Sequence, residues 1–332
     1  MMSKSTLISE MQKFHFGSRV LCSDGESGIL AHIVFDSATR RLTYIGVKQS
    51  RLFGKTVYLP FNTLVEATGE GITLNITRAE LAAASTTAQG AALDNKSTVE
   101  RADSANRGTL LLVATHPENG ELAYIAAHHL RPGHDTLLQG QYITNIAPGH
   151  ISVTISDEAL NALPPYRPDN ELQREVENII FDLTPLHIDM RGIKARVLDS
   201  VLYLDGNISS TLRGDIVHDQ ALGVPGLLEI KSNLVGDDQL AADIAMALAQ
   251  DSRTRDLSIG VYPRLGDVRL SGSVHTSQQK AAAEEIVRNF PGVRSVTHDL
   301  VVNPKAGMLQ VMSSTGVESE DKVPGKYIRH TK

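Results

Sequence analysis

The chain has 332 residues and a mass of 35.9 kDa, enough for roughly two to four domains of ordinary size. Hydrophobic residues make up 41% and charged residues 21%, which excludes a disordered chain, and the single cysteine, Cys22, excludes an intramolecular disulfide and a thiolate-rich zinc site. Residues 170–303 hold 13 basic and 19 acidic residues and so account for the whole net charge of −6. With no tryptophan and 5% aromatic residues, the chain is a poor candidate for binding nucleic acid, and such a partner is not expected.

The N-terminus predicts a protein without an export signal. Residues 1–16 lack the apolar stretch of a secretory signal peptide and include Glu10. No apolar run approaches the roughly 18 residues that a membrane-spanning helix needs. We therefore expect a cytoplasmic protein, with peripheral binding at the inner leaflet of the membrane as the alternative.

The first half of the chain contains an internal repeat. LTYIGVK at residues 42–48 aligns with LAYIAAH at 122–128, and ITLNITRAELAA at 72–83 aligns with ISVTISDEALNA at 151–162. Each copy predicts short strands joined by tight turns and closed by a short helix, which is typical of a small β-barrel. The expected bounds are 14–84 for the first barrel, 85–106 for a small polar linker and 107–163 for the second barrel.

The first copy resembles the PRC-barrel family. The resemblance rests on a glycine-containing turn at 23–28, a strand at 29–35, the LTYIGVK strand and the VYLPF strand with its proline. The second copy departs from this pattern, because Thr144 stands in place of Pro60 and the DGESG turn is missing. The resemblance implies a module that docks proteins or RNA.

The second half also repeats, at a spacing of 66 residues. VPGLLEIKSNLV at 224–235 matches FPGVRSVTHDLV at 290–301, and VLYLDGNIS at 201–209 matches DVRLSGSVH at 267–275. Apolar periodicity and turn residues predict the order helix, strand, strand, helix, strand in each copy, an α+β sandwich with both helices on one face of a small sheet. The expected bounds are 169–236 and 237–303 for the two copies and 304–332 for a flexible tail.

This pattern resembles the BON domain, an αββαβ module of bacterial envelope and osmotic-stress proteins. The second copy carries the resemblance more fully, with VRLSGSV, an alanine-rich helix and PGVRSVTHDL. The first copy departs in its second helix, STLRGDIVHDQALGVPG, which lacks the alanine-rich face. The resemblance implies association with phospholipid surfaces or other macromolecules and does not imply catalysis.

No motif predicts a catalytic residue, a metal site or a cofactor. Gly54-Lys55-Thr56 resembles the end of a phosphate-binding loop, but the strand VYLPF follows where that loop needs a helix. Histidines gather in the second barrel copy, at His116, His128, His129, His134 and His150. Because His128 and His129 are adjacent, on a strand they are expected to face opposite sides and not to share a metal ion. Cys22 lies in an apolar strand and is expected to be a small core residue.

Two groups of basic residues are candidate binding sites. In the second αββαβ copy, a basic patch for phosphate head groups is expected from Arg264, Arg269, Arg288 and Arg294. In the first barrel, Arg51 and Lys55 are the candidates, in a stretch that also holds Arg40, Arg41 and Lys48. Gly206 and Gly272 recur at equivalent places and are expected to be structural, at a bulge or a close approach of two backbones.

A non-catalytic binding or scaffold protein accounts best for these features. We expect an adaptor for a protein assembly or a phospholipid surface, acting through the tandem BON-like units, with the duplication favouring multivalent contact. The alternative is an RNA- or ribosome-associated factor that acts through the first barrel. Self-association into a homo-oligomer is compatible with the sequence, and an enzyme is the least supported class.

Overall fold

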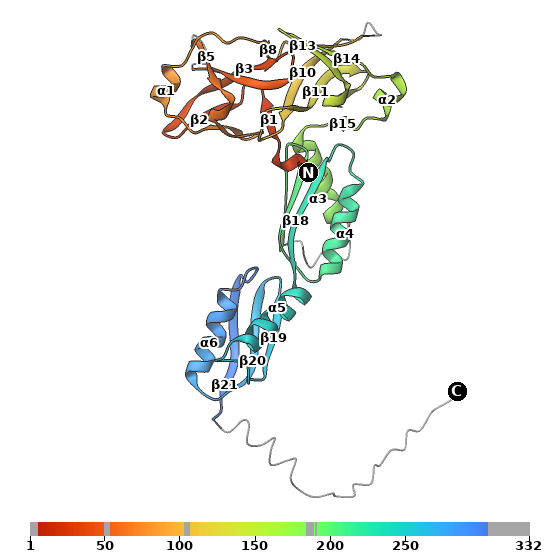
Figure 1. The fold of residues 1–332 in the computed structure, drawn as a ribbon. Coiled ribbons are helices and arrows are strands. Elements are labelled where there is room, and N and C mark those ends of the chain that lie inside the picture. Colours follow the sequence, from red (N-terminus) through yellow and green to blue (C-terminus); the bar gives the residue numbers. More distant parts are fainter. Residues whose placement is uncertain (1–5, 50–53, 103–106, 184–188, 190, 305–332) are drawn as a thin grey trace, which may run out of the picture. The chain divides into compact units, whose positions relative to one another are not determined.

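The computed structural model describes residues 6–49, 54–102, 107–183, 189 and 191–304. The protein is a mixed α/β, strand-rich chain that divides into two compact units (Figure 1). The first unit comprises Met1–Asp205 and Arg213–Leu234, and the second comprises Gly206–Leu212 and Val235–Lys332. The two regions expected as barrels therefore lie in one unit, together with most of the first αββαβ copy.

The first unit contains two large sheets that follow the same plan. The first copy comprises β2 (Arg19–Cys22), β3 (Gly25–Asp36), β4 (Arg41–Lys48), β5 (Thr56–Pro60), η2 (Phe61–Thr63), β6 (Leu64–Thr68), β7 (Gly71–Leu74) and α1 (Arg78–Ala82). The second comprises β9 (Thr98–Arg101), β10 (Arg107–Thr115), β11 (Leu122–Arg131), β12 (His134–Gln139), η3 (Gly140–Tyr142), β13 (Ile143–Ala147), β14 (His150–Val153) and α2 (Asp157–Ala162). Strand order is β5-β4-β3-β2-β7-β6 in the first sheet and β13-β14-β9-β10-β11-β12 in the second, which β15 (Pro165–Tyr166) extends beyond β12.

The two copies are in register over much of their length. From η2 and η3 onward, equivalent elements begin 79 residues apart. Pro60, which precedes η2, therefore corresponds to Gln139 and not to Thr144, so the expected alignment at this point is wrong. The expected turn at 23–28 is also shorter than predicted, because β3 already begins at Gly25.

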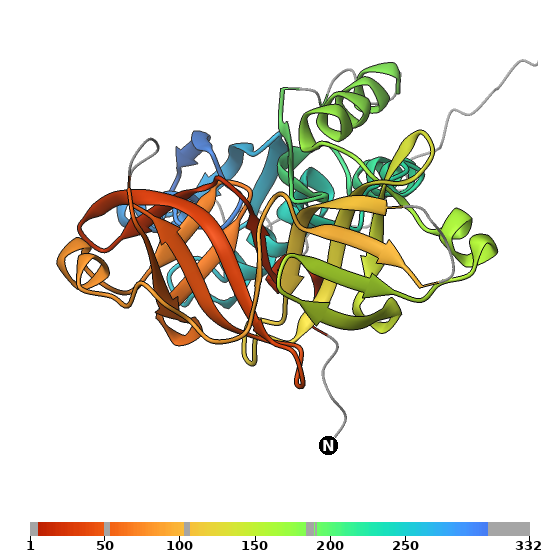
Figure 2. The same ribbon diagram turned by 90° about the horizontal axis from the view of Figure 1, so that it is seen from above.

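The two sheets exchange strands. β1 (Gln12–His15), which precedes the first copy, pairs with β10 of the second, and β8 (Ala91–Leu93), which precedes the second copy, pairs with β3 of the first. One hydrophobic cluster runs through both sheets and includes the fully buried Phe14 of β1 and Leu93 of β8. Figure 2 shows the two curved sheets lying side by side. The segment 85–106 is thus not a linker, because it contains β8 and β9; its strands are three and four residues long, too short to show a period in the sequence.

Each half of the remaining chain has the order helix, strand, strand, helix, strand. The first module comprises α3 (Asp169–Asp182), β16 (Ile193–Leu198), β17 (Val201–Ile208), α4 (Thr211–Leu222) and β18 (Glu229–Gly236), with strand order β16-β17-β18. The second comprises α5 (Asp237–Gln250), β19 (Ile259–Arg264), β20 (Asp267–Val274), α6 (Ser277–Arg288) and β21 (Ser295–Val302), with strand order β19-β20-β21.

In the second module both helices pack on one face of the sheet. α5 contributes Leu240, Ile244 and Leu248, four residues apart on one side of the helix, to a core with Leu270 and Leu300 from the strands. α6 begins with a capping box, in which Thr276 and Gln279 satisfy each other's backbone N–H groups. The sheet face opposite these helices is left for contact with solvent or a partner.

Candidate functional site

The open face of the C-terminal sheet is the candidate binding surface. β20 pairs antiparallel with β19 and parallel with β21, so that alternate residues of all three strands point away from the helices. These outward residues are exposed: Tyr262, Arg264, Asp267, Arg269, Ser295, Thr297, Asp299 and Val301. Tyr262 and Val301 are large apolar side chains that are 52% and 61% exposed. The surface therefore combines apolar side chains with charged ones.

Two of the four predicted arginines, Arg264 and Arg269, lie on this face, and a third, Arg294, lies at its end beside the hairpin turn, where its guanidinium donates to the Leu265 carbonyl at 3.4 Å. Tyr262 pairs with Arg269 across β19 and β20, and Arg264 pairs with Asp267, which makes Arg264 and Arg269 diagonal neighbours. Arg294 donates its backbone N–H to Gly266 O at 2.8 Å, which places it beside the turn between these strands.

The fourth arginine lies elsewhere in the module. Arg288 is the last residue of α6, in the helical layer, and it pairs with Glu284 of the same helix. The expected patch of four is thus a cluster of Arg264, Arg269 and Arg294. Arg288 lies on a helix, so the direction of its side chain follows the helical period and not the alternation of the strands.

Local charges limit the strength of the arginine cluster. The Arg269 guanidinium lies 5.3 Å from the centre of the Tyr262 ring, a cation–π geometry, and 3.6 Å from the Asp299 carboxylate. Both partners of the ion pair are more than half exposed, so solvent screens their attraction and leaves Arg269 available to another anion. Arg264 lies opposite Asp267, whose carboxylate accepts a hydrogen bond from Ser295 at 2.7 Å.

The turn that carries the cluster is held from below by a buried carboxylate. Leu265 and Gly266 both have positive φ, 49° and 82°, as a two-residue type I′ hairpin requires. Their N–H groups donate to Asp237 at the start of α5, at 2.7 and 3.3 Å. Asp237 was not among the predicted site residues. An aspartate begins the first helix of both modules, and this repetition could have indicated its role.

The two predicted structural glycines have positive φ, 115° at Gly206 and 130° at Gly272. A Cβ atom on Gly272 would lie 2.3 Å from the Ser258 carbonyl oxygen, so no larger residue fits there without a backbone shift. The backbone just before β19 therefore lies directly against Gly272 of β20.

The basic candidates of the first sheet lie only partly within the described residues. Lys55 is exposed just before β5, so a strand follows the Gly-Lys-Thr stretch, while Arg51 lies outside the described residues. Arg40 is occupied within the fold, because its guanidinium donates to the Ile143 carbonyl at 2.7 Å. Cys22 is buried, 6% exposed, in the apolar core.

His128 and His129 do not face opposite sides, contrary to expectation. His129 has a positive φ of 59° within a register shift of β11, and the two rings lie 3.6 Å apart between centroids. The irregular backbone breaks the alternation on which the prediction rested. His128 contacts the Asp135 carboxylate, and no group of three or more potential metal ligands occurs among the described residues.

A buried charge cluster in the first unit was also missed. Lys13 of β1 is 2% exposed, and burial lowers its pKa, while the negative charges of Asp199 and Glu229 oppose that shift. The Asp199 carboxylate lies 2.6 Å from His15 Nε2 and accepts a hydrogen bond from the Gly69 N–H at 2.9 Å. These contacts join the N-terminal strand and the first sheet to the hairpin of the first αββαβ module.

Comparison with known proteins identifies one family in this chain. Residues 236–304 match the family model of the BON domain, so this part of the chain is a BON domain. The chain is 24% identical over 157 residues to osmotically-inducible protein Y of Escherichia coli (strain K12), an alignment that covers 43% of this chain and 77% of that protein.

Two solved structures of CdsD, a structural protein of the type III secretion system of Chlamydia trachomatis, are also similar, one of them of its C-terminal domain. Both have a TM-score of 0.35, with 13% and 14% identity; they cover 51% and 46% of this chain and 74% and 71% of theirs. In the part of the chain that the structure describes, no helix is long and apolar enough to cross a membrane.

Proposed function

We propose that the protein is a non-catalytic adaptor that binds an anionic phospholipid surface through the open face of its BON domain. The observation that carries the proposal is the pair of Arg264 and Arg269 beside the exposed Tyr262 on a sheet face that the domain's own helices leave uncovered, with Arg294 at the adjoining turn. Arginines near an anionic membrane surface contribute about 1 kcal/mol each, and tyrosine suits the boundary between head groups and acyl chains. The similarity to an osmotically induced protein agrees with a role in stress.

We also propose that residues 169–236 are a second BON-like module. The alignment with osmotically-inducible protein Y spans 157 residues, more than twice the length of 236–304. In addition, Asp169 accepts the N–H groups of Asp199 and Ser200, at 2.7 and 2.9 Å, as Asp237 does for the second hairpin. A second module increases the avidity of weak surface contacts. The two sheets that exchange strands would bind a protein partner, since their first copy resembles a PRC barrel.

Flotation with vesicles tests the membrane proposal. The full chain is mixed with vesicles of phosphatidylcholine, alone or with phosphatidylglycerol, over a series of salt concentrations. We expect flotation only with the anionic vesicles, decreasing with salt because the attraction is screened. Replacing Arg264, Arg269 and Arg294 together by Gln is expected to weaken binding by about tenfold or more.

The matched control is Arg288→Gln, which removes one arginine from the helical layer of the same domain. It is expected to float like the unmodified chain. A loss in Arg288→Gln equal to that in each of the single variants Arg264→Gln, Arg269→Gln and Arg294→Gln would mean that net charge, and not this face, drives binding. Absence of flotation on both lipids would rule out the lipid partner and favour a protein partner.

Two expectations remain predictions. An RNA-associated role predicts nucleic acid that co-purifies with the chain, with affinity that falls steeply with salt. A cytoplasmic location, at the inner leaflet, predicts that the chain fractionates with cytoplasm and inner membrane.

A further inference from the structure

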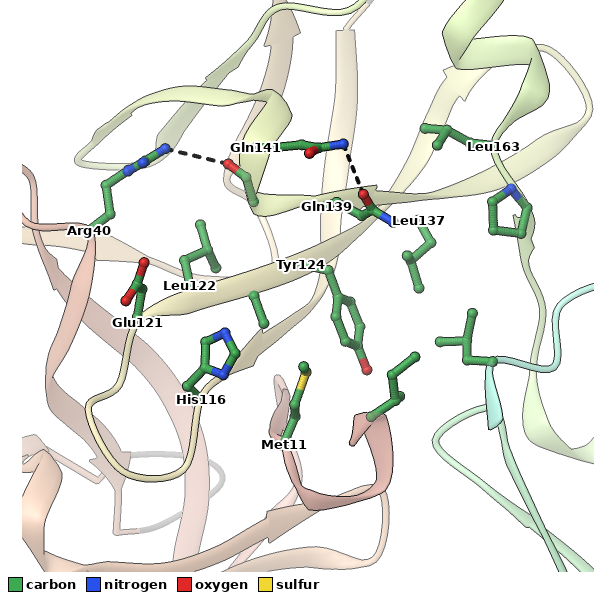
Figure 3. Close-up of a pocket in the computed structure, with 15 residues that line it drawn as sticks. Met11, Arg40, His116, Glu121, Leu122, Tyr124, Leu137, Gln139, Gln141 and Leu163 are labelled. Atoms are coloured by element: carbon green, nitrogen blue, oxygen red, sulfur yellow. Dashed lines mark hydrogen bonds between the residues drawn. The ribbon is translucent and has the colours of Figure 1, made fainter. Parts of the chain in front are cut away.

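The first unit contains a pocket of about 520 Å³ that the proposed membrane role does not use. It lies where η1 (Ile8–Glu10), the second sheet and Leu228 of the first αββαβ module meet (Figure 3). This volume is within the range of about 300–1,000 Å³ that is usual for small-molecule sites, which form preferentially where separate structural parts adjoin.

The pocket has an apolar side and a polar side. Figure 3 shows Leu137 and Leu163 on one side, Arg40, His116 and Glu121 on the other, and Tyr124 between them. Arg40 and Glu121 carry opposite charges, and Arg40 is already hydrogen-bonded to the carbonyls of Gly140 and Ile143. The charges of Arg40 and Glu121 offset each other, which favours an uncharged ligand.

Tyr124 supplies an unused hydrogen-bond donor. The residue is 5% exposed, and its hydroxyl finds no partner among the described residues. Burial raises the pKa of the phenol, and the negative charges of Asp199 and Asp169 raise it further, so the hydroxyl keeps its proton. A buried donor without an acceptor lowers stability, and a ligand that carries an acceptor removes that penalty.

The cover over Tyr124 is adaptable. Ile8 and Met11 pack against the cluster that contains Tyr124, and methionine is unbranched and fills irregular spaces by changing rotamer. Met11 and Tyr124 both line the pocket, so a bound ligand meets a side chain that can change rotamer beside the phenol.

We propose that this pocket binds a small, uncharged compound with an apolar body and a carbonyl oxygen that accepts a hydrogen bond from the Tyr124 hydroxyl. The apolar body contacts the leucine side of the pocket. The Gln141 amide donates to the Gln139 side-chain oxygen at 3.0 Å, which leaves the Gln139 NH2 group and the Gln141 side-chain oxygen for a second polar group.

A pair of probes that differ only in the acceptor tests this proposal. Butyrophenone and butylbenzene share the ring and chain, and only the ketone has a carbonyl. Their dissociation constants are measured by ligand-observed NMR with the full chain and with Tyr124→Phe, which removes the hydroxyl and little else. The ratio of the two dissociation constants is compared between the unmodified chain and Tyr124→Phe. In this comparison the different solubilities of the two probes cancel.

We expect both probes to bind, and the preference for the ketone to fall about tenfold in Tyr124→Phe, the value of one hydrogen bond. Tyr166→Phe is the matched control, because it removes another phenol of raised pKa, half-buried, that packs on the same cluster but does not line the pocket. Ala123→Trp, which fills the pocket, is expected to abolish binding of both probes. An unchanged ratio in Tyr124→Phe, or no binding of either probe, would overturn the proposal.

Discussion

Gly272 is a residue of the C-terminal domain at which a side chain has no space. Its φ of 130° is open to glycine and strained for other residues, and the Ser258 carbonyl occupies the space of a side chain. We expect Gly272→Ala to lower the free energy of unfolding by at least about 2 kcal/mol through backbone strain and overpacking. Chemical denaturation of the full chain, with Ser271→Ala on the same strand as control, measures this. A loss no larger than that of the control would contradict the close approach.

Asp251 is a second residue whose behaviour is set by its neighbours. Hydrogen bonds from the Arg253 side chain and backbone lower the pKa of its carboxyl to about 2. The carboxylate therefore stabilises the fold above the ordinary carboxyl pKa of 3.8, and this contribution is lost as the pH falls through about 2. We expect Arg253→Gln to return the pKa toward 3.8, as followed by NMR titration of the side-chain carboxyl carbon. An unshifted value would show that Arg253 is not the cause, and Arg255→Gln, next to Asp256, serves as control.

At the scale of the element, the two αββαβ modules share one contact between their first helix and their first hairpin. In each, an aspartate at the start of the first helix binds the N–H groups of a hairpin turn that has two successive positive φ values. Three of these four turn residues are not glycine, so the turn itself is strained, and the carboxylate offsets the strain. The first helix and the first hairpin therefore stabilise each other.

Removing that carboxylate is expected to destabilise the BON domain. Asp237→Ala leaves the N–H groups of Leu265 and Gly266 without their acceptor, and hydrogen bonds to charged groups contribute about 1.5–3 kcal/mol. Thermal unfolding measures the loss, and Asp256→Ala, at an 87% exposed carboxylate, is expected to change it little. If both variants unfold alike, the turn does not depend on Asp237. The same change should loosen the arginine cluster, because Arg264 adjoins the turn.

At the scale of the whole molecule, the exchanged strands make the two sheets of the first unit one folding body. β1 and β8 each leave their own copy and complete the other sheet, and their buried residues join a single apolar cluster. Neither sheet has a full complement of strands without the other copy. Unfolding of the two sheets is therefore expected to be cooperative.

Phe14→Ala tests this cooperativity. The side chain is fully buried, and its removal is expected to cost about 3–5 kcal/mol. Amide hydrogen exchange should accelerate in β4 and β5 of the first sheet as well as in β10 and β11 of the second. Acceleration confined to β10 and β11 would contradict a shared body. Leu93→Ala, the equivalent change in β8, is likewise expected to accelerate hydrogen exchange in both sheets.

Much of the candidate site could be anticipated, but not its composition. The repeat of 66 residues located the hairpin, the arginines and Gly272, since each strand carries its alternation in its own sequence. The separation of Arg288 from the other three arginines followed from the predicted helix that contains it, although the expected patch of four did not take that layer into account. Lys13 and Tyr124 gave no signal, since their burial comes from segments far away in the chain.

The sequence by itself determined the repeats, the order of helices and strands in the second half, and the residue types of the open face, because side-chain periodicity and turn residues act over a few positions. Only the tertiary structure decided that β1 and β8 change places between the sheets, that Asp237 meets a turn 28 residues away, and that a pocket forms around Tyr124. These features depend on hydrogen bonds and packing between distant segments. No local period of the chain encodes which distant strand completes a sheet or which side chain is thereby buried.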